Sequence, residues 1–110
     1  MDILDHLEQV IAERSSASPD ESYVAKLNAK GMPLIARKLG EEGVEAAIAA
    51  ISGDDAELVG EAADIIFHLL VALQARGLSL GDVKAELEKR EGVSGLEEKA
   101  SRGQKPEGAS

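Results

Sequence analysis

The chain has 110 residues, 44% of them apolar, a net charge of −9 at pH 7 and no cysteine. This length suits one domain with its own core, and the lack of cysteine excludes disulfides, thiolate zinc sites and cysteine nucleophiles. The negative net charge argues against nucleic-acid binding. No apolar stretch is suited to a signal peptide or a membrane span, so we expect a cytoplasmic protein with no membrane partner.

Helix-forming residues dominate, and aromatic residues make up only 2% of the chain, too few for an ordinary sheet core. We therefore predict an all-α fold of about five helices. The expected helices run from about Asp2 to Glu13, from Asp20 to the break at Lys30–Pro33, from Pro33 to about Ile51, from about Asp55 to Arg76, and onward from Ser79. Residues 1–91 then form one domain, and residues 92–110 form a loosely held, charged tail rich in glycine.

Acidic residues lie in unusual positions on the third expected helix. At about 100° per residue, Glu42 and Glu45 fall on one stripe with Lys38 and Glu41, and apolar residues lie within or beside that stripe. Charged residues on a helix normally occupy the face opposite the apolar one. This placement predicts that the carboxylates have a function other than solvation.

The fourth expected helix shows the same feature more strongly. Between Ala62 and Leu73 every residue is apolar except Asp64 and His68, which predicts a helix buried nearly all round. Glu61 and Asp64 are three residues apart there, and an unpaired carboxylate pair is costly to bury.

A divalent cation would remove that cost. Mg²⁺ prefers hard oxygen ligands, and carboxylates three residues apart on a helix can converge on one ion. We therefore predict that Glu42, Glu45, Glu61 and Asp64 bind Mg²⁺ between two antiparallel helices. The alternative is that Lys38 and other bases merely neutralise these acids, as is usual for helical glutamate pairs on a protein surface.

Four segments of the chain resemble a known family. They are Ser22–Leu27, Lys38–Glu45, Glu61–Asp64 followed by His68–Val71, and Ser94–Arg102. In these segments, which span nearly the whole chain, the sequence is similar to the phosphoribosyl-ATP pyrophosphatases, the histidine-biosynthesis branch of the MazG-like all-α nucleotide pyrophosphatases. The resemblance implies hydrolysis of phosphoribosyl-ATP to phosphoribosyl-AMP and pyrophosphate, a requirement for Mg²⁺, and a homodimer.

Further residues are candidates for the chemistry. Glu41 is the candidate general base, although an ordinary surface glutamate is an equal alternative. Candidate phosphate-binding residues are Lys26, Lys30, Lys38, Lys99 and Arg102. Lys38 can instead pair with Glu42, and the basic residues of the tail, Lys105 included, can simply solubilise it.

The remaining polar candidates are expected to have structural roles. His68 is interpreted as a hydrogen-bonded core or interface histidine, Tyr23 as a packing residue or a platform for a base, and Arg37 as solvent-facing. Because one short chain cannot easily cover a helix that is apolar on every side, we expect a dimer whose third and fourth helices form a shared bundle.

Two other functions are compatible with this pattern. One is a house-cleaning hydrolase of the same superfamily that acts on other nucleoside triphosphates. The other is a non-catalytic helical dimerisation module whose acids bind metal structurally or pair with lysines.

Overall fold

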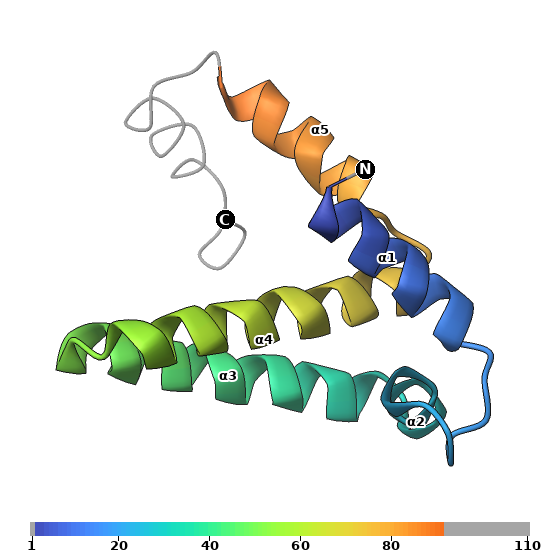
Figure 1. Cartoon of the computed structure of the whole chain (residues 1–110). Coiled ribbons are helices and arrows are strands. Elements are labelled where there is room, and N and C mark those ends of the chain that lie inside the picture. The colour runs from blue at the N-terminus through green and yellow to red at the C-terminus, as the bar shows by residue number, and fades with distance from the viewer. Residues whose placement is uncertain (1, 92–110) are drawn as a thin grey trace. The chain divides into compact units, whose positions relative to one another are not determined.

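The structure, a computed structural model, describes residues 2–91, and every regular element in this range is a helix (Figure 1). The helices are α1 (Ile3–Arg14), α2 (Tyr23–Lys30), α3 (Met32–Ser52), α4 (Asp55–Ala75) and α5 (Leu80–Glu91). The predicted all-α class and the five helices are confirmed. The chain divides into two compact units, the first ending at Leu80 and the second beginning at Gly81.

Side-chain caps define where the first two helices begin. Asp2 Oδ1 accepts hydrogen bonds from the backbone N–H groups of Leu4 at 2.6 Å and Asp5 at 3.1 Å, as expected for a helix N-cap. The predicted start of the second helix at Asp20 was wrong. Ser22 has extended backbone angles, and its Oγ accepts from the N–H of Ala25 at 3.2 Å, so the helix begins at Tyr23.

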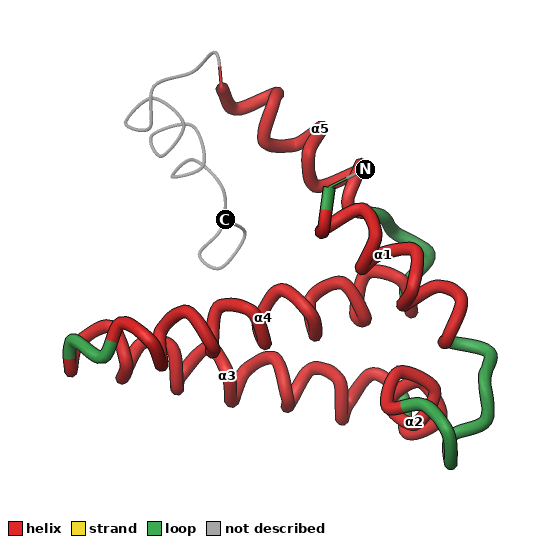
Figure 2. The backbone as a smooth tube through the Cα atoms, viewed as in Figure 1, coloured by secondary structure: helices red, strands yellow, loops and turns green. Residues whose placement is uncertain are grey.

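A short turn joins α3 to α4 and makes them an antiparallel pair (Figure 2). Gly53 ends α3 in the left-handed conformation, with φ of 81°, and its N–H donates to the carbonyl of Ala49 at 3.1 Å. Asp54 then caps α4, because its carboxylate accepts from the N–H of Glu57 at 3.0 Å. These two caps reverse the direction of the chain within a few residues. The acidic residues of α3 therefore face α4, the helix that carries Glu61 and Asp64.

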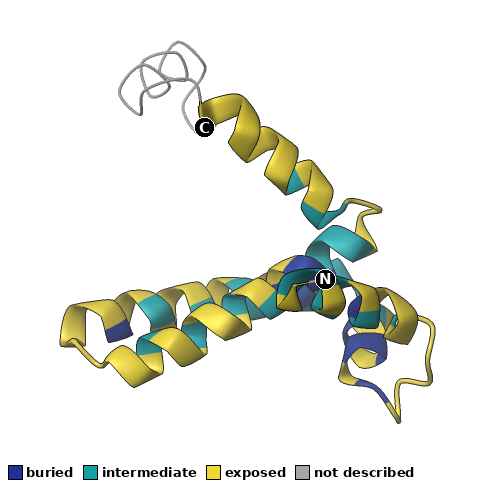
Figure 3. Ribbon diagram, turned by 45° about the horizontal axis from the view of Figure 1, so that its top comes forward, coloured by how far each residue is buried: buried dark blue, intermediate teal, exposed yellow. Residues whose placement is uncertain are grey.

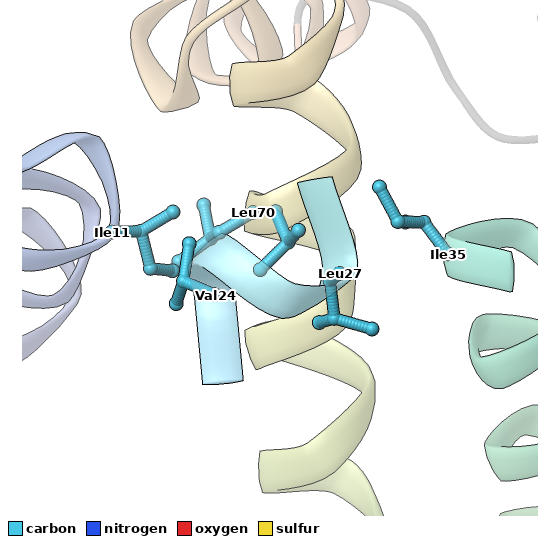
Figure 4. Close-up of a cluster of buried hydrophobic side chains, with 6 residues drawn as sticks. Ile11, Val24, Leu27, Ile35 and Leu70 are labelled. Atoms are coloured by element: carbon cyan, nitrogen blue, oxygen red, sulfur yellow. The ribbon is translucent and has the colours of Figure 1, made fainter. Parts of the chain in front are cut away.

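The core lies where α1 and α2 pack on the first part of α3 and the second half of α4 (Figure 4). Its buried members are Ile11, Val24, Leu27, Ile35, Leu70 and Val71. Burying each of these side chains stabilises the fold by about 1.5–3 kcal/mol. The core thereby holds α2 against the beginning of α3, next to the predicted site.

Much of the α3–α4 pair is exposed in the single chain (Figure 3). The expectation that α4 is buried nearly all round was wrong for one chain, because α4 has α3 as its main neighbour and α1 contacts only part of it. Large apolar side chains are exposed on both helices. They are Val44, Ile48 and Ile51 on α3, and Val59, Ile66 and Leu69 on α4.

Helix α5 is described by itself, since most of it belongs to the second unit. None of its residues is buried, and Arg90 Nε donates to Glu86 Oε2 at 2.9 Å one turn away. None of the five helices, α5 included, combines the length and the apolar character needed to cross a membrane.

Candidate active site

The four predicted metal ligands are distributed over the antiparallel pair, Glu42 and Glu45 on α3 and Glu61 and Asp64 on α4. Each carboxylate acts electrostatically on others of the set. The charges of Asp64 and Glu45 raise the pKa of Glu42, and those of Glu45 and Asp64 raise the pKa of Glu61. The structure therefore brings both acidic pairs into one neighbourhood, as the sequence predicted.

Glu42 is held beside a buried histidine. Its Oε1 lies 2.7 Å from Nδ1 of His68, and the Glu42 side chain is only 15% exposed. The same Nδ1 lies 2.9 Å from the backbone carbonyl of Asp64. Since both neighbours of Nδ1 are acceptors, Nδ1 carries a proton, and in the neutral ring Nε2 is then the acceptor.

Tyr23 completes this arrangement from α2. Its hydroxyl lies 2.9 Å from Nε2 of His68 and donates to it. The Tyr23 ring stacks on Phe67 with centroids 5.9 Å apart and meets the His68 ring edge-on. Burial, together with the charges of Glu42 and Asp64, raises the pKa of the Tyr23 phenol, so the hydroxyl keeps its proton. Tyr23 and His68 thus orient Glu42 from the interior.

Glu61 and Glu45 form a carboxyl pair across the two helices. A hydrogen bond between their side chains, followed by burial and the charge of Glu45, raises the pKa of Glu61 from 4.5 to about 7. Two carboxyl groups hydrogen-bond only when one of them is protonated. At neutral pH the pair therefore holds a proton for part of the time, in a place where a cation would also be stabilised.

Burial and the nearby carboxylates also raise the pKa of Glu42, while the charges of His68 and Lys38 lower it. The charge of Lys38 thus acts on Glu42, although it is the smallest of these influences. The basic groups do not cancel the effect of burial and of the neighbouring acids, because the net shift of the Glu42 pKa is upward.

Two buried carboxylate oxygens are chemically suited to bind a cation. Within residues 2–91, Oε1 of Glu42 and Oε1 of Glu61 lie below the surface and accept no well-aligned hydrogen bond. For Glu42 this holds despite the 2.7 Å contact, since the N–H of His68 is aligned with the Asp64 carbonyl. Acceptor-only oxygens of this kind are hard ligands that need a proton or a metal ion.

The ligands are not yet gathered around one point. Among the described residues, no three Asp, Glu or His side chains are grouped closely enough to hold an ion as they stand. Glu45 and Asp64 are both exposed, whereas Glu42 is held beside His68. The prediction of a four-carboxylate metal site accordingly stays a prediction, with its donors near each other.

A cavity of about 750 Å³ adjoins these acids, between α2 and the beginning of α3. Three predicted phosphate-binding residues, Lys26, Lys30 and Lys38, line it together with Tyr23. The other two, Lys99 and Arg102, lie outside the described residues, as does Lys105. The structure thus places the three described candidates for phosphate binding on one cavity.

Comparison with known proteins decides the family. The family model described as phosphoribosyl-ATP pyrophosphohydrolase matches residues 4–91. The chain belongs to this family. The family resemblance seen in the sequence motifs is therefore confirmed.

Several relatives of the phosphoribosyl-ATP pyrophosphohydrolase family are similar over nearly their whole length, and all three described here carry the name phosphoribosyl-ATP pyrophosphatase. The protein from Erythrobacter litoralis is 64% identical over 103 residues, which cover 94% of this chain and 99% of the relative. That from Novosphingobium aromaticivorans is 60% identical over 101 residues, covering 92% and 94%. That from Dinoroseobacter shibae is 57% identical over 102 residues, covering 93% and 100%.

In this chain, the candidate general base Glu41 lies near Arg37 on α3, and the sequence had suggested no functional role for Arg37. Glu41 is 54% exposed, and its Oε2 lies 3.9 Å from Nε of Arg37, which is 66% exposed. Arg37 is solvent-facing, as predicted, but it also lines the cavity, which sequence reasoning missed. The sequence clue to this role of Arg37 was its position four residues before Glu41 and next to Lys38.

Proposed function

We propose that this chain hydrolyses phosphoribosyl-ATP to phosphoribosyl-AMP and pyrophosphate, a step of histidine biosynthesis, in the cytoplasm. Family membership and the shared name of the relatives support this reaction. The observation that carries the proposal is the pair of buried carboxylate oxygens of Glu42 and Glu61 that accept no well-aligned hydrogen bond, near a cavity lined by basic side chains. Such a site can bind a polyphosphate only if a cation offsets the negative charge of the protein.

Glu42, Glu45, Glu61 and Asp64 are the residues that would hold Mg²⁺. Bound Mg²⁺ would offset the negative charge that develops on the pyrophosphate leaving group. The contribution of the chain is to keep Glu42 fixed through His68 and Tyr23 and to leave the exposed carboxylates of Glu45 and Asp64 able to adjust.

Other residues act on the water and on the phosphates. Glu41, exposed and next to Glu42, is our candidate for accepting the proton of the attacking water. The ammonium groups of Lys26 and Lys38 bind oxygens of the triphosphate from the cavity side. Lys99 and Arg102, in the segment Ser94–Arg102 that resembles the family, are further candidates for phosphate binding.

The working unit in this proposal is a homodimer. Each long helix carries a stripe of exposed apolar residues, at 44, 48 and 51 on α3 and at 59, 66 and 69 on α4. These spacings place each set on one side of its helix, where a second copy can bury it. Pairing two α3–α4 hairpins would also complete the burial that the apolar sequence of α4 predicts.

Product analysis tests the proposed reaction. The purified protein is incubated with phosphoribosyl-ATP, dUTP or dCTP, each with Mg²⁺ and with EDTA, and phosphorylated products are separated by chromatography. We expect phosphoribosyl-AMP and pyrophosphate from the first substrate, in the presence of Mg²⁺ alone. Turnover of only dUTP and dCTP would indicate a house-cleaning hydrolase instead.

A single variant separates an enzyme from a helical dimerisation module. Glu42→Gln removes the buried carboxylate charge while it keeps the size of the side chain, and we expect activity to fall at least about a hundredfold. Glu13→Gln on the exposed side of α1 is the matched control. Full activity of Glu42→Gln would contradict the proposed site.

A further inference from the structure

The basic residues of the first unit are concentrated around one cavity. Between residues 1 and 80 the chain has six lysines and arginines, and four of them line the 750 Å³ cavity between α2 and α3. These four are Lys26, Lys30, Arg37 and Lys38. In a chain with a net charge of −9, such a cluster is a local reversal of sign that favours an anion.

The cavity is longer than a triphosphate site needs. Lys38 acts on Glu42 from one turn away, which at 1.5 Å per residue is about 6 Å along α3. Pro33, at the far end of the lining on the same helix, is about 13 Å from Glu42 by the same rise. Lys30 ends α2 just before this point, three residues ahead of Pro33. The cluster therefore has a part near the carboxylates and a part distant from them.

Between these parts the cavity has apolar walls and an aromatic ring. Leu27 and Leu34 line it, and the Tyr23 ring, stacked on Phe67, is about half exposed. A flat heterocycle suits such a surface, since it is apolar on its faces and stacks on aromatic rings. The order along the site is thus the carboxylates with Lys38 and Arg37, the apolar middle, and the distal Lys30.

We propose that Lys30 binds the phosphate of the second ribose of phosphoribosyl-ATP and so distinguishes this substrate from ATP. This inference rests on the proposed function. Phosphoribosyl-ATP carries two anionic groups on opposite sides of its adenine, a triphosphate and the phosphate of the added ribose. With the triphosphate at the carboxylates, the adenine lies in the apolar middle and the second phosphate reaches Lys30.

Arg37 lies in the part of the cluster near the carboxylates. Its Nε is 3.9 Å from Glu41 Oε2, and it is adjacent to Lys38 on α3. Lys30 is therefore the basic residue of the lining that is distant from the carboxylates, and Arg37 offers an internal comparison within the same cavity.

Binding of the product phosphoribosyl-AMP, compared with binding of AMP, which lacks the phosphoribosyl group, isolates the contribution of that group without turnover. Calorimetric titrations in EDTA give both affinities, and their ratio is the quantity to compare. We expect the wild-type protein to bind phosphoribosyl-AMP about a hundredfold more tightly than AMP, and Lys30→Ala to reduce that ratio about tenfold, whereas Arg37→Ala should leave the ratio unchanged. Lys30→Arg is expected to keep the ratio, because the charge remains.

Arg14→Ala, which removes an exposed guanidinium from the end of α1, is the matched control and should keep the wild-type ratio. An unchanged ratio in Lys30→Ala would overturn the inference. An equal loss of affinity for AMP and phosphoribosyl-AMP in Lys30→Ala would also overturn it, because Lys30 would then act on the shared nucleotide or on the fold. If the wild-type protein hydrolyses phosphoribosyl-ATP but the affinity ratio does not change in Lys30→Ala, only this inference fails and the proposed function stands.

Discussion

Mg²⁺ binding is expected to expel the proton that Glu45 and Glu61 share. The hydrogen bond between their side chains requires this proton, and the charge of a bound cation opposes it. The number of protons released per ion therefore depends on how fully the pair is protonated beforehand. This number is a direct readout of the interaction across α3 and α4.

The size of the effect follows from the pKa of Glu61, which is raised to about 7. Full displacement predicts release of about 0.9 protons per ion at pH 6, about 0.5 at pH 7 and about 0.1 at pH 8. A carboxylate with an ordinary pKa near 4.5 would be fully ionised throughout this range and would release almost none.

Isothermal titration calorimetry measures this release when Mg²⁺ is titrated in buffers of different ionisation enthalpy at each pH. Glu45→Gln is the informative variant, since its amide can donate to the Glu61 carboxylate and stabilise the ionised form. We expect proton release at pH 7 to fall close to zero in this variant. Glu13→Gln on α1 is expected to behave as the wild type.

Proton release that stays constant between pH 6 and pH 8, or that persists unchanged in Glu45→Gln, would refute the reasoning. Binding of Mg²⁺ without any dependence on Glu45 would show in addition that the cation does not displace this hydrogen bond.

The same pKa shift sets the pH dependence of stability in the metal-free protein. The folded state binds the proton of Glu61 more tightly than the unfolded state, so this contribution is fully present below about pH 4.5 and is lost as the pH rises through about 7. In EDTA, the melting temperature of the protein should therefore fall between pH 5 and pH 8 as this contribution to stability is lost. Glu45→Gln should flatten that part of the profile.

Three further outcomes are expected. His68→Ala should raise the Mg²⁺ concentration for half-maximal activity about tenfold, and His68→Asn should restore part of this loss. Tyr23→Phe should raise the same concentration about threefold. Titrations of activity with Mg²⁺ would show whether Glu42 depends on these partners. Leu27→Ala empties a core position that is 1% exposed and should cost about 2–5 kcal/mol in urea unfolding; a loss below about 1 kcal/mol would contradict the assigned core. Ile48→Lys on α3 should shift the protein toward monomer in light-scattering chromatography, whereas Ile3→Lys on the exposed side of α1 should not; a dimer that survives the first change would argue against the proposed interface.

The helices and their caps were predictable because they depend on neighbours within a few residues. Apolar residues at helical spacing and the caps at Asp2, Gly53 and Asp54 defined α1, α3 and α4 to within about two residues. The start of α2 was misplaced because acidic residues and Ser22 are all acceptable caps, and only the backbone angles decide between them.

The grouping of acids on two facing helices was likewise visible in the sequence, because residues three apart share a helical face. The sequence determined that Glu42, Glu45, Glu61 and Asp64 are close enough to interact once α3 and α4 pair. It did not determine which of them would be buried.

Tertiary structure alone decided the partners. The hydrogen bond between Tyr23 and His68 joins residues 45 positions apart, and the contact of Glu45 with Glu61 depends on how far α3 slides along α4. The cavity between α2 and α3 likewise exists only because the core fixes the position of α2. Helical periodicity specifies the face of the helix on which a side chain lies. The offset between two packed helices decides which atoms meet, and this offset is set by the interdigitation of side chains that are distant in sequence.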